Sequence, residues 1–240
     1  VIAFSIATLV FIPMLTSTTT PIKSYLSYTL PVVGAGWIIA LTGLIDDVKE
    51  LSAKKKMIGI LLAASLVWFL TDFRLNDFKI PFGGPLLHFE PWLSYLLTVI
   101  WIVAITNAVN LIDGLDGLVS GVSIISLVTM GIVSYFFLPV PNLFLTMTIF
   151  VLVASIAGFF PFNYHPAILY LGDTGALFIG FMISVLSLQG LKNATAVAVV
   201  TPMIILGVPI TDTFLAIIRR TLSGQKFYKP DRNHLHHRLL

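Results

Sequence analysis

The chain has 240 residues, of which 57% are hydrophobic and 10% charged, and its mean hydropathy is +0.97. This composition excludes an ordinary soluble domain and indicates a polytopic membrane protein. The net charge of +3 gives no sign of nucleic-acid binding, and the absence of cysteine excludes a disulfide scaffold, a thiolate metal site and a cysteine nucleophile.

Apolar runs of roughly 17 to 25 residues can cross a bilayer as helices. Eight such runs lie at 1–18, 25–45, 57–72, 91–110, 118–138, 142–160, 175–190 and 194–218. Pro202, Gly207 and Pro209 interrupt the last run and predict a kinked or broken span that lines a cavity. We therefore expect an all-α integral membrane protein with about eight transmembrane helices in a single domain over 1–240. Because the first residue is Val1 and no cleavable signal precedes it, we expect a longer product.

Basic residues predict the orientation in the membrane. Ten of them fall in connections on one side, at Lys49, Lys54, Lys55, Lys56, Arg219, Arg220, Lys226, Lys229, Arg232 and Arg238. Four fall on the other side, at Lys23, Arg74, Lys79 and Lys192. The side with ten should be cytoplasmic. The longest external connection, 74–90, is expected to form a small hairpin around Phe82-Gly83-Gly84-Pro85.

Asp46 and Asp47 end the second run, where acids oppose the helix macrodipole at a cost of about 0.3–1 kcal/mol each. Mg²⁺ or a nearby lysine would explain them, and a solvated helix end is the alternative. Lysines that open the next run are ordinarily positive-inside anchors. The proximity of Lys56 to the two acids makes it a candidate phosphate ligand.

The stretch 107–117 places amides and acids at the end of an apolar run. Asn107, Asn110, Asp113 and Asp116 recur every three residues, which predicts one polar stripe if the stretch is helical. The glycines that follow each acid allow the backbone to approach a ligand closely. The alternative is a helix end with Asp-Gly turns that face water.

Two further clusters are predicted on the same cytoplasmic side. Asp173 opens the seventh run in a Gly-Asp-Thr-Gly turn, where it could cap the helix or bind Mg²⁺. His234, His236 and His237 lie in a basic tail and fit phosphate recognition better than zinc. Asp212, in the kinked run, is a functional candidate or a partner for Arg219 or Arg220.

Together these clusters resemble the polyprenyl-phosphate N-acetylhexosamine-1-phosphate transferases. The resemblance rests on LIDD at 44–47, NAVNLIDGLDGL at 107–118, FNYHPA with LGDTGAL at 162–177, and HLHH at 234–237. It implies a multi-pass enzyme of the plasma (inner) membrane with its active site facing the cytoplasm. Such an enzyme moves a sugar 1-phosphate from a UDP-sugar to undecaprenyl phosphate, releases UMP and needs Mg²⁺, with Mn²⁺ as an alternative ion. A homodimer is a further expectation.

The resemblance also implies roles for individual residues. Asp46 and Asp47 would lie near the lipid phosphate and the metal, and Asp173 with Asp46 would bind the metal. The nucleotide-sugar would be surrounded by Asn110, Asp113 and Asp116, and Asn163 would lie at the uracil. The tail histidines would hold the pyrophosphate or the sugar. The full candidate set comprises Asp46, Asp47, Asp113, Asp116, Asp173, His234, His236 and His237 for catalysis, and Lys56, Asn107, Asn110, Asn163 and Arg232 for substrate binding.

The tail distinguishes two branches of this family. An His-x-His-His run is similar to the UDP-GlcNAc-using members that start wall teichoic acid, O-antigen (lipopolysaccharide) or common-antigen synthesis. The branch that uses UDP-MurNAc-pentapeptide has three consecutive histidines and is the alternative. The family's first helix, its basic Gly-Gly loop and its C-terminal helix or helices have no counterpart in the chain. A secondary transporter is the alternative of another class, although transporters place ionisable groups near the midplane.

Overall fold

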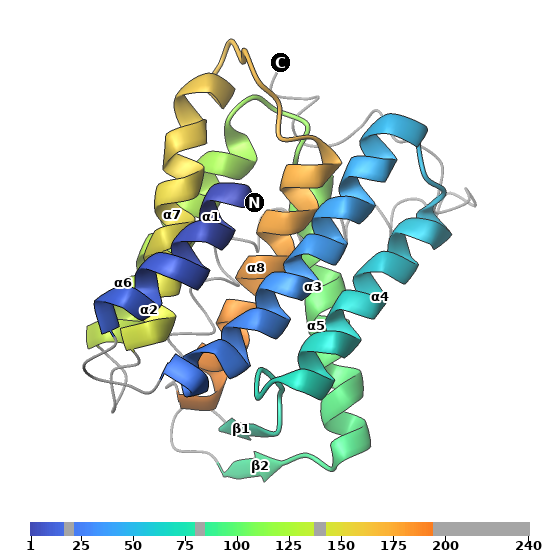
Figure 1. Cartoon of the computed structure of the whole chain (residues 1–240). Coiled ribbons are helices and arrows are strands. Elements are labelled where there is room, and N and C mark those ends of the chain that lie inside the picture. Colours follow the sequence, from blue (N-terminus) through green and yellow to red (C-terminus); the bar gives the residue numbers. More distant parts are fainter. Residues whose placement is uncertain (17–21, 80–84, 137–142, 194–240) are drawn as a thin grey trace.

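The structure is a computed structural model that describes residues 1–16, 22–79, 85–136 and 143–193 (Figure 1). The first helical segment comprises α1 (Ile2–Ile6), the π-helix η1 (Ala7–Phe11) and α2 (Ile12–Thr16). The longer helices are α3 (Ile22–Lys49), α4 (Ala53–Leu70), α5 (Pro91–Leu111), α6 (Leu118–Phe136), α7 (Leu143–Asn163) and α8 (Gly172–Asn193). Two short strands, β1 (Asp77–Lys79) and β2 (Leu86–His88), complete the described elements.

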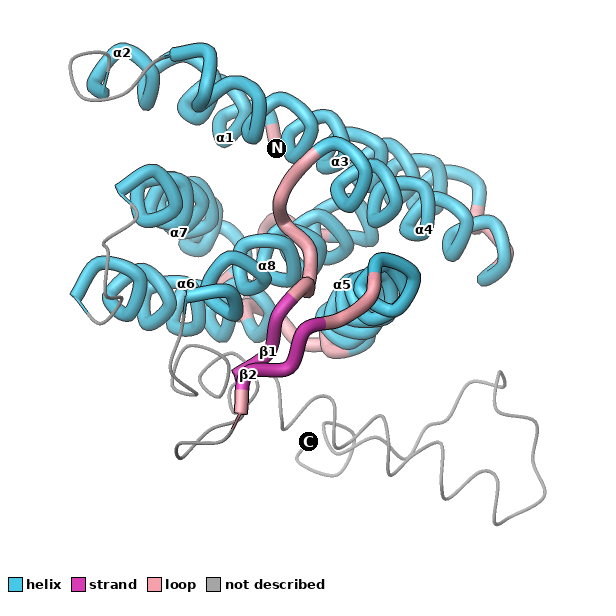
Figure 2. Tube along the Cα trace, turned by 90° about the horizontal axis from the view of Figure 1, so that it is seen from below, coloured by secondary structure: helices cyan, strands magenta, loops and turns pink. Residues whose placement is uncertain are grey.

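Helix α8 is the central helix of the bundle. Every residue from 176 to 188 is buried, and α8 packs mainly against α3 and α5 (Figure 2). Gly180 permits the contact with α5, because a Cβ there would lie 2.9 Å from the backbone of Thr106. Trp101 of α5 donates its indole N–H to the carbonyl of Ser184, at 3.2 Å, and to the hydroxyl of Ser187, at 3.0 Å. The central helix is therefore fixed by close packing and by hydrogen bonds within the apolar interior.

Among the helices that the structure describes, four are long and apolar enough to cross a membrane: α3 over Leu26–Lys49, α5, α6 and α7. Large side chains that face outward from these helices, such as Ile125 at 61% exposed and Phe136 at 70%, are those that lipid would cover. The predictions of a largely helical fold and of a multi-pass membrane protein are confirmed. The predicted eighth span, with Pro202, Gly207, Pro209 and Asp212, lies outside the described residues.

The predicted hairpin is present. Strands β1 and β2 pair antiparallel, with Asp77 opposite His88, and the backbone N–H of Phe89 donates to the carbonyl of Asn76 at 2.8 Å. The hairpin lies at one end of the helical bundle (Figure 1).

Two helix ends differ from the sequence prediction in ways that affect the site. Helix α3 continues past residue 45 to Lys49, so Asp46 and Asp47 lie in its last turns. Helix α5 ends at Leu111, so the predicted single polar stripe is wrong in its second half. Asp113 and Asp116 lie in turns instead, because each precedes a glycine and Gly117 takes a φ of +73°.

Candidate active site

Three of the four polar clusters meet at the end of the bundle opposite the hairpin. They come from the last turns of α3, the connection between α5 and α6, and the start of α8 (Figure 1). The fourth predicted cluster, with Arg232, His234, His236 and His237, lies outside the described residues. Segments more than 100 residues apart in the sequence, such as 46–47 and 173–174, thus share one site.

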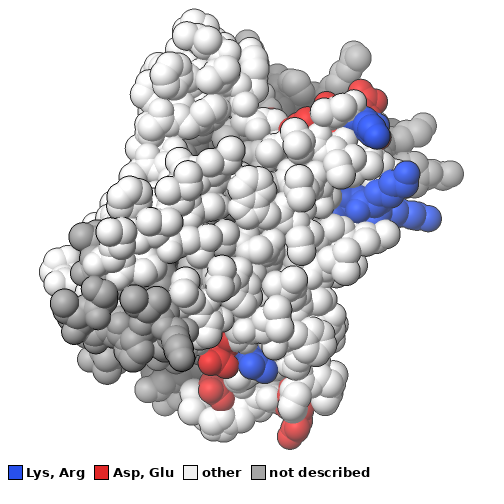
Figure 3. All heavy atoms as spheres, in the orientation of Figure 1, with Lys and Arg blue, Asp and Glu red and all other residues white. Residues whose placement is uncertain are grey.

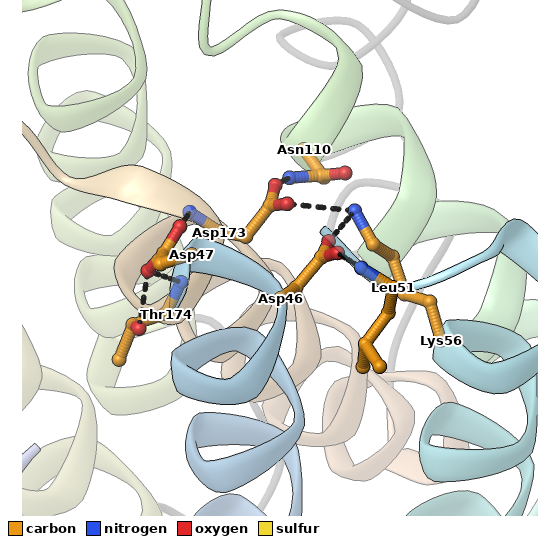
Figure 4. A network of polar contacts seen from close by, with 7 residues as sticks. All are labelled: Asp46, Asp47, Leu51, Lys56, Asn110, Asp173 and Thr174. Carbon is orange, nitrogen blue, oxygen red and sulfur yellow. Dashed lines mark hydrogen bonds and ion pairs between the residues drawn. The ribbon is translucent and has the colours of Figure 1, made fainter. Parts of the chain in front are cut away.

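A chain of polar contacts joins α3, α4, α5 and α8 (Figure 4). The ammonium of Lys56 forms ion pairs with the carboxylates of Asp46 and Asp173, the latter at 2.8 Å. The other oxygen of Asp173 accepts a hydrogen bond of 2.5 Å from the amide of Asn110. Asp46 is 7% exposed and also accepts the backbone N–H of Leu51 at 2.5 Å. The nearby lysine that the sequence suggested for Asp46 is therefore Lys56.

Asp47 lies beside these residues but makes different contacts. One oxygen accepts the backbone N–H of Asp173 at 2.7 Å. The other accepts the backbone N–H of Thr174 at 3.0 Å and its hydroxyl at 2.5 Å. The carboxylate at the end of α3 therefore binds the first turn of α8.

Asp113 is a half-buried carboxyl group that faces other negative charges. No hydrogen bond or ion pair from the described part of the chain reaches its carboxylate. Burial, followed by the nearby charges of Asp173 and Asp47, raises the pKa of Asp113 to about 6. The carboxylates of Asp46, Asp47, Asp113 and Asp173 thus lie at this end of the bundle, and Lys56 is paired with two of them, those of Asp46 and Asp173.

Asp116 and Asn163 contact the loop between α7 and α8. The carboxylate of Asp116 accepts the backbone N–H of Ala167 at 3.1 Å and contacts Nδ1 of His165 at 3.0 Å, and these two contacts lower the pKa of Asp116. Asn163 is 4% exposed. Its oxygen accepts the hydroxyl of Ser120 at 2.7 Å, and its NH₂ group donates to the carbonyl of Leu169 at 3.0 Å.

Asn107 does not join these contacts. Its NH₂ group donates to the carbonyl of Val103, one turn earlier in the same helix, at 2.8 Å.

Several residues at the site were not anticipated from the sequence. Thr174 donates to Asp47, Ser120 to Asn163, and His165 contacts Asp116. Gly43 allows α3 to reach α8, since a Cβ there would lie 2.6 Å from backbone atoms of Asp173 and Thr174. The glycine within LTGLIDD was the one available signal, because a small residue in an apolar helix favours close packing of another helix.

The donor set fits a hard cation. Asp46, Asp113 and Asp173 supply carboxylate oxygens, which Mg²⁺ prefers. Within the described residues, no three acidic or histidine side chains are arranged as a ready-made metal site. The chemistry of the site therefore suits a cation that takes one or two carboxylates and completes its coordination with substrate oxygens.

The charged side chains are segregated toward the two ends of the molecule. Figure 3 shows Lys, Arg, Asp and Glu along the upper right edge and at the lower end of this face, with uncharged residues over the rest of it. Among the described residues, every Asp and Glu lies in the terminal turns of a helix or in a connection between helices, the hairpin included, at positions 46, 47, 50, 72, 77, 90, 113, 116 and 173. This arrangement matches a protein whose middle crosses a bilayer and whose polar chemistry lies at an interface.

Comparison with known proteins gives consistent matches. One relative is a probable undecaprenyl-phosphate N-acetylglucosaminyl 1-phosphate transferase of Bacillus subtilis, 46% identical over 210 residues, which cover 87% of this chain and 57% of the relative. A decaprenyl-phosphate N-acetylglucosaminephosphotransferase of Mycolicibacterium smegmatis is 36% identical, over 87% of this chain and 56% of the relative. A phospho-N-acetylmuramoyl-pentapeptide-transferase of Staphylococcus saprophyticus is 33% identical, over 83% of this chain and 64% of the relative.

The chain spans little more than half the length of the Bacillus and Mycolicibacterium relatives. The model of glycosyl transferase family 4 matches residues 29–191, which include the acids of α3, the turns after α5 and the start of α8. The predicted resemblance to membrane phospho-sugar transferases is confirmed. The chain belongs to glycosyl transferase family 4.

Proposed function

We propose that this chain is the catalytic membrane part of an enzyme that transfers N-acetylglucosamine 1-phosphate from UDP-GlcNAc to undecaprenyl phosphate. The reaction takes place at the cytoplasmic face of the plasma membrane, releases UMP and begins a cell-envelope glycopolymer. One observation carries the proposal: in a chain of this family, Asp46, Lys56, Asn110 and Asp173 converge at one end of a membrane-spanning bundle.

The location of the site suits the two substrates. A polyprenyl phosphate has its tail in hydrocarbon and its phosphate at the interface, while a nucleotide-sugar arrives from water. Lys56 is 19% exposed at its side chain, so its ammonium can exchange a carboxylate partner for a phosphate oxygen. Asn110 orients the Asp173 carboxylate through the 2.5 Å hydrogen bond.

The reaction joins two anions, so their charge must be neutralised. Lys56 supplies one positive charge, and the basic tail with Arg232, His234, His236 and His237 supplies more. Asp173 with Asp46 would hold Mg²⁺, which would supply further charge neutralisation at the phosphates when bound. Asp113 and Asp116 then contribute to binding the nucleotide-sugar.

Direct attack by the lipid phosphate on UDP-GlcNAc is the mechanism that requires the fewest catalytic groups from the protein. A phosphate monoester has its second pKa near ~6 and is mostly dianionic at neutral pH, so no general base is required. An oxygen of the lipid phosphate forms a bond to the β-phosphorus of UDP-GlcNAc as the bond from that phosphorus to the bridging oxygen breaks. UMP leaves with that oxygen. Sugar phosphate trapped on the protein from radiolabelled UDP-GlcNAc, without lipid acceptor, would instead support an aspartyl-phosphate intermediate.

The sugar assignment has two supports. The His-x-His-His tail fits the UDP-GlcNAc branch, and the Bacillus relative, which is named for N-acetylglucosamine transfer, is 46% identical, against 33% for the relative named for the muramoyl-pentapeptide. A secondary transporter fits less well, because the acids of the described residues lie near the ends of helices and not at mid-span.

UMP release by the whole protein in detergent tests this proposal. We expect release from UDP-GlcNAc that requires both undecaprenyl phosphate and Mg²⁺, and its loss in Asp173→Ala. Asp72→Ala is the matched control, since Asp72 is an exposed acid near the hairpin, and it should retain activity. UMP release from UDP-MurNAc-pentapeptide but not from UDP-GlcNAc would assign the protein to the other branch of the family. No release with any UDP-hexosamine would refute the enzyme assignment.

A further inference from the structure

Asp47 contacts the start of α8 in the manner of a helix N-cap supplied by another helix. The first backbone N–H groups of any helix lack partners within that helix. In α8, two of these groups, on Asp173 and Thr174, donate to Asp47, and the Thr174 hydroxyl adds a third hydrogen bond (Figure 4). The negative charge of Asp47 also complements the positive end of the α8 macrodipole.

Glycines in both α3 and α8 permit this contact. Gly172 takes a φ of +59°, and a Cβ there would lie 2.9 Å from an oxygen of the Asp47 carboxylate. One turn before Asp47, Gly43 lies so near α8 that a Cβ would approach the Asp173 carbonyl oxygen to 2.6 Å. The close approach therefore depends on glycines from both helices, independently of the hydrogen bonds themselves.

The backbone and the side chain of Asp173 contact different partners. Its backbone N–H is held by Asp47, while its side chain points to Lys56 and Asn110 (Figure 4). A change in the position of the first turn of α8 would thus move the Asp173 carboxylate relative to Lys56 and Asn110. Asp47, by contrast, already accepts three hydrogen bonds with its two oxygens.

We propose that Asp47 is a positioning residue, which caps α8 and thereby fixes the Asp173 carboxylate, and that it binds neither substrate nor metal. The inference rests on the proposed function only in that Asp173 is taken as a residue of the active site. It replaces the role that the family resemblance implied for Asp47, which was proximity to the lipid phosphate and the metal.

Amide hydrogen exchange tests the cap without metal or substrate. In the whole protein in detergent, the peptide that contains residues 172–176 should exchange about fivefold faster in Asp47→Ala, as expected when a helix loses its N-cap. Thr174→Val removes only the hydroxyl donor and should give a smaller increase. Asp113→Asn is the matched control, because it removes a charge near Asp173 but no hydrogen bond to α8, and its exchange should equal that of the unsubstituted protein.

Conservative substitution separates positioning from ligation. The oxygen of Asn at position 47 can still accept a backbone N–H, and the Thr174 hydroxyl can rotate to accept from the amide. Asp47→Asn should therefore retain much more UMP release than Asp47→Ala. Its rate of amide hydrogen exchange at residues 172–176 should lie between the rates of Asp47→Ala and the unsubstituted protein. At Asp173, where the charge itself is needed, Asn and Ala should be equally damaging.

Two results would overturn the inference. One is unchanged exchange at 172–176 in both Asp47→Asn and Thr174→Val, which can be measured even if Asp47→Ala does not fold. The other is an equal loss of UMP release in Asp47→Asn and in Asp47→Ala, measured under conditions in which the unsubstituted protein releases UMP. Absence of UMP release in the unsubstituted protein would refute the proposed function instead, and the exchange data would still decide whether Asp47 caps α8.

Discussion

Lys56 joins carboxylates from two helices that are far apart in the sequence. It is the third lysine of a triplet that opens α4, and a lysine triplet beside a membrane span is ordinarily an anchor. Lys54 and Lys55 are exposed, in keeping with that role. Lys56 instead turns toward Asp46 and Asp173. Its nearness to Asp46 followed from the sequence, whereas its contact with Asp173 depends on how α8 packs against α3.

Replacement of Lys56 by methionine should destabilise the protein. Asp46, with a side chain 6% exposed, would keep a charge without a counter-ion. Loss of one partner of a fully buried ion pair costs about 3–5 kcal/mol, and we expect about 2 kcal/mol here, because Lys56 and Asp173 are partly exposed. Chemical denaturation in detergent without metal would measure the loss.

Lys54→Met and Lys55→Met are the controls for this experiment. Each removes the same charge from the same turn of α4, but neither lysine is paired with a carboxylate in the part of the chain that the structure describes. Exposed substitutions of this kind usually change stability by less than ~0.5 kcal/mol. An equal effect of all three substitutions would mean that charge near the membrane, and not the Asp46 ion pair, is responsible.

At the scale of elements, sequence patterns predicted where helices occur better than what their ends do. Apolar runs predicted α5 as 91–110 and α6 as 118–138, close to Pro91–Leu111 and Leu118–Phe136. The Asp-Gly pairs explained why the chain turns after α5. The predicted helix at 25–45 was too short at its polar end, since the charged residues from Asp46 onward continue the helix once other elements supply their partners.

The partners of the site residues could not be deduced from local patterns. Nothing near Asp47 in the sequence indicates that it binds Thr174, 127 residues later. The family resemblance implied a position for Asn163 at the uracil, but no local pattern indicated that its side chain is buried between Ser120 and Leu169. Such contacts arise from the packing of α3 against α8 and of α6 against α7, which composition and periodicity do not determine.

The loop between α7 and α8 should depend on Asn163. Asn163→Ala would leave the buried hydroxyl of Ser120 and the carbonyl of Leu169 without their present partner. Unsatisfied buried polar groups cost about 1–3 kcal/mol, so we expect a loss of stability in that range. Thermal unfolding together with limited proteolysis in the loop would show it, with earlier cleavage near residues 164–170.

Asn107→Ala provides the matched control for Asn163. It makes the same change, but the Asn107 amide donates only to the carbonyl of Val103 within its own helix, which already has a place in the helical hydrogen-bond pattern. The loss of stability in Asn107→Ala should stay below ~0.5 kcal/mol, and proteolytic cleavage in the loop between α7 and α8 should not change. If the two variants behaved alike, the hydrogen bonds of Asn163 would not be what holds the loop.

For the whole molecule, the separation of polar groups between two ends implies a direction across the membrane. The end with the site carries Lys49 and the triplet Lys54 to Lys56, whereas the hairpin end carries Arg74 and Lys79. The positive-inside rule then predicts that the site faces the cytoplasm, where the proposed nucleotide-sugar donor is available. Because these 240 residues contain no cysteine, single introduced cysteines can report their orientation once any cysteine elsewhere in the protein has been replaced.

Three exposed positions suit this experiment: Ser52, Ile168 at 76% exposed, and Leu86 at 51%. With a maleimide that cannot cross membranes, Ser52→Cys and Ile168→Cys should react in inverted vesicles but not in intact cells. Leu86→Cys, in β2, should react in intact cells. Ala64→Cys, at a fully buried position, should react in neither.

Reaction of all three exposed positions from one side would contradict a membrane-spanning bundle. The reverse pattern would place the site outside the cell, away from UDP-GlcNAc, and the proposed reaction could not occur there.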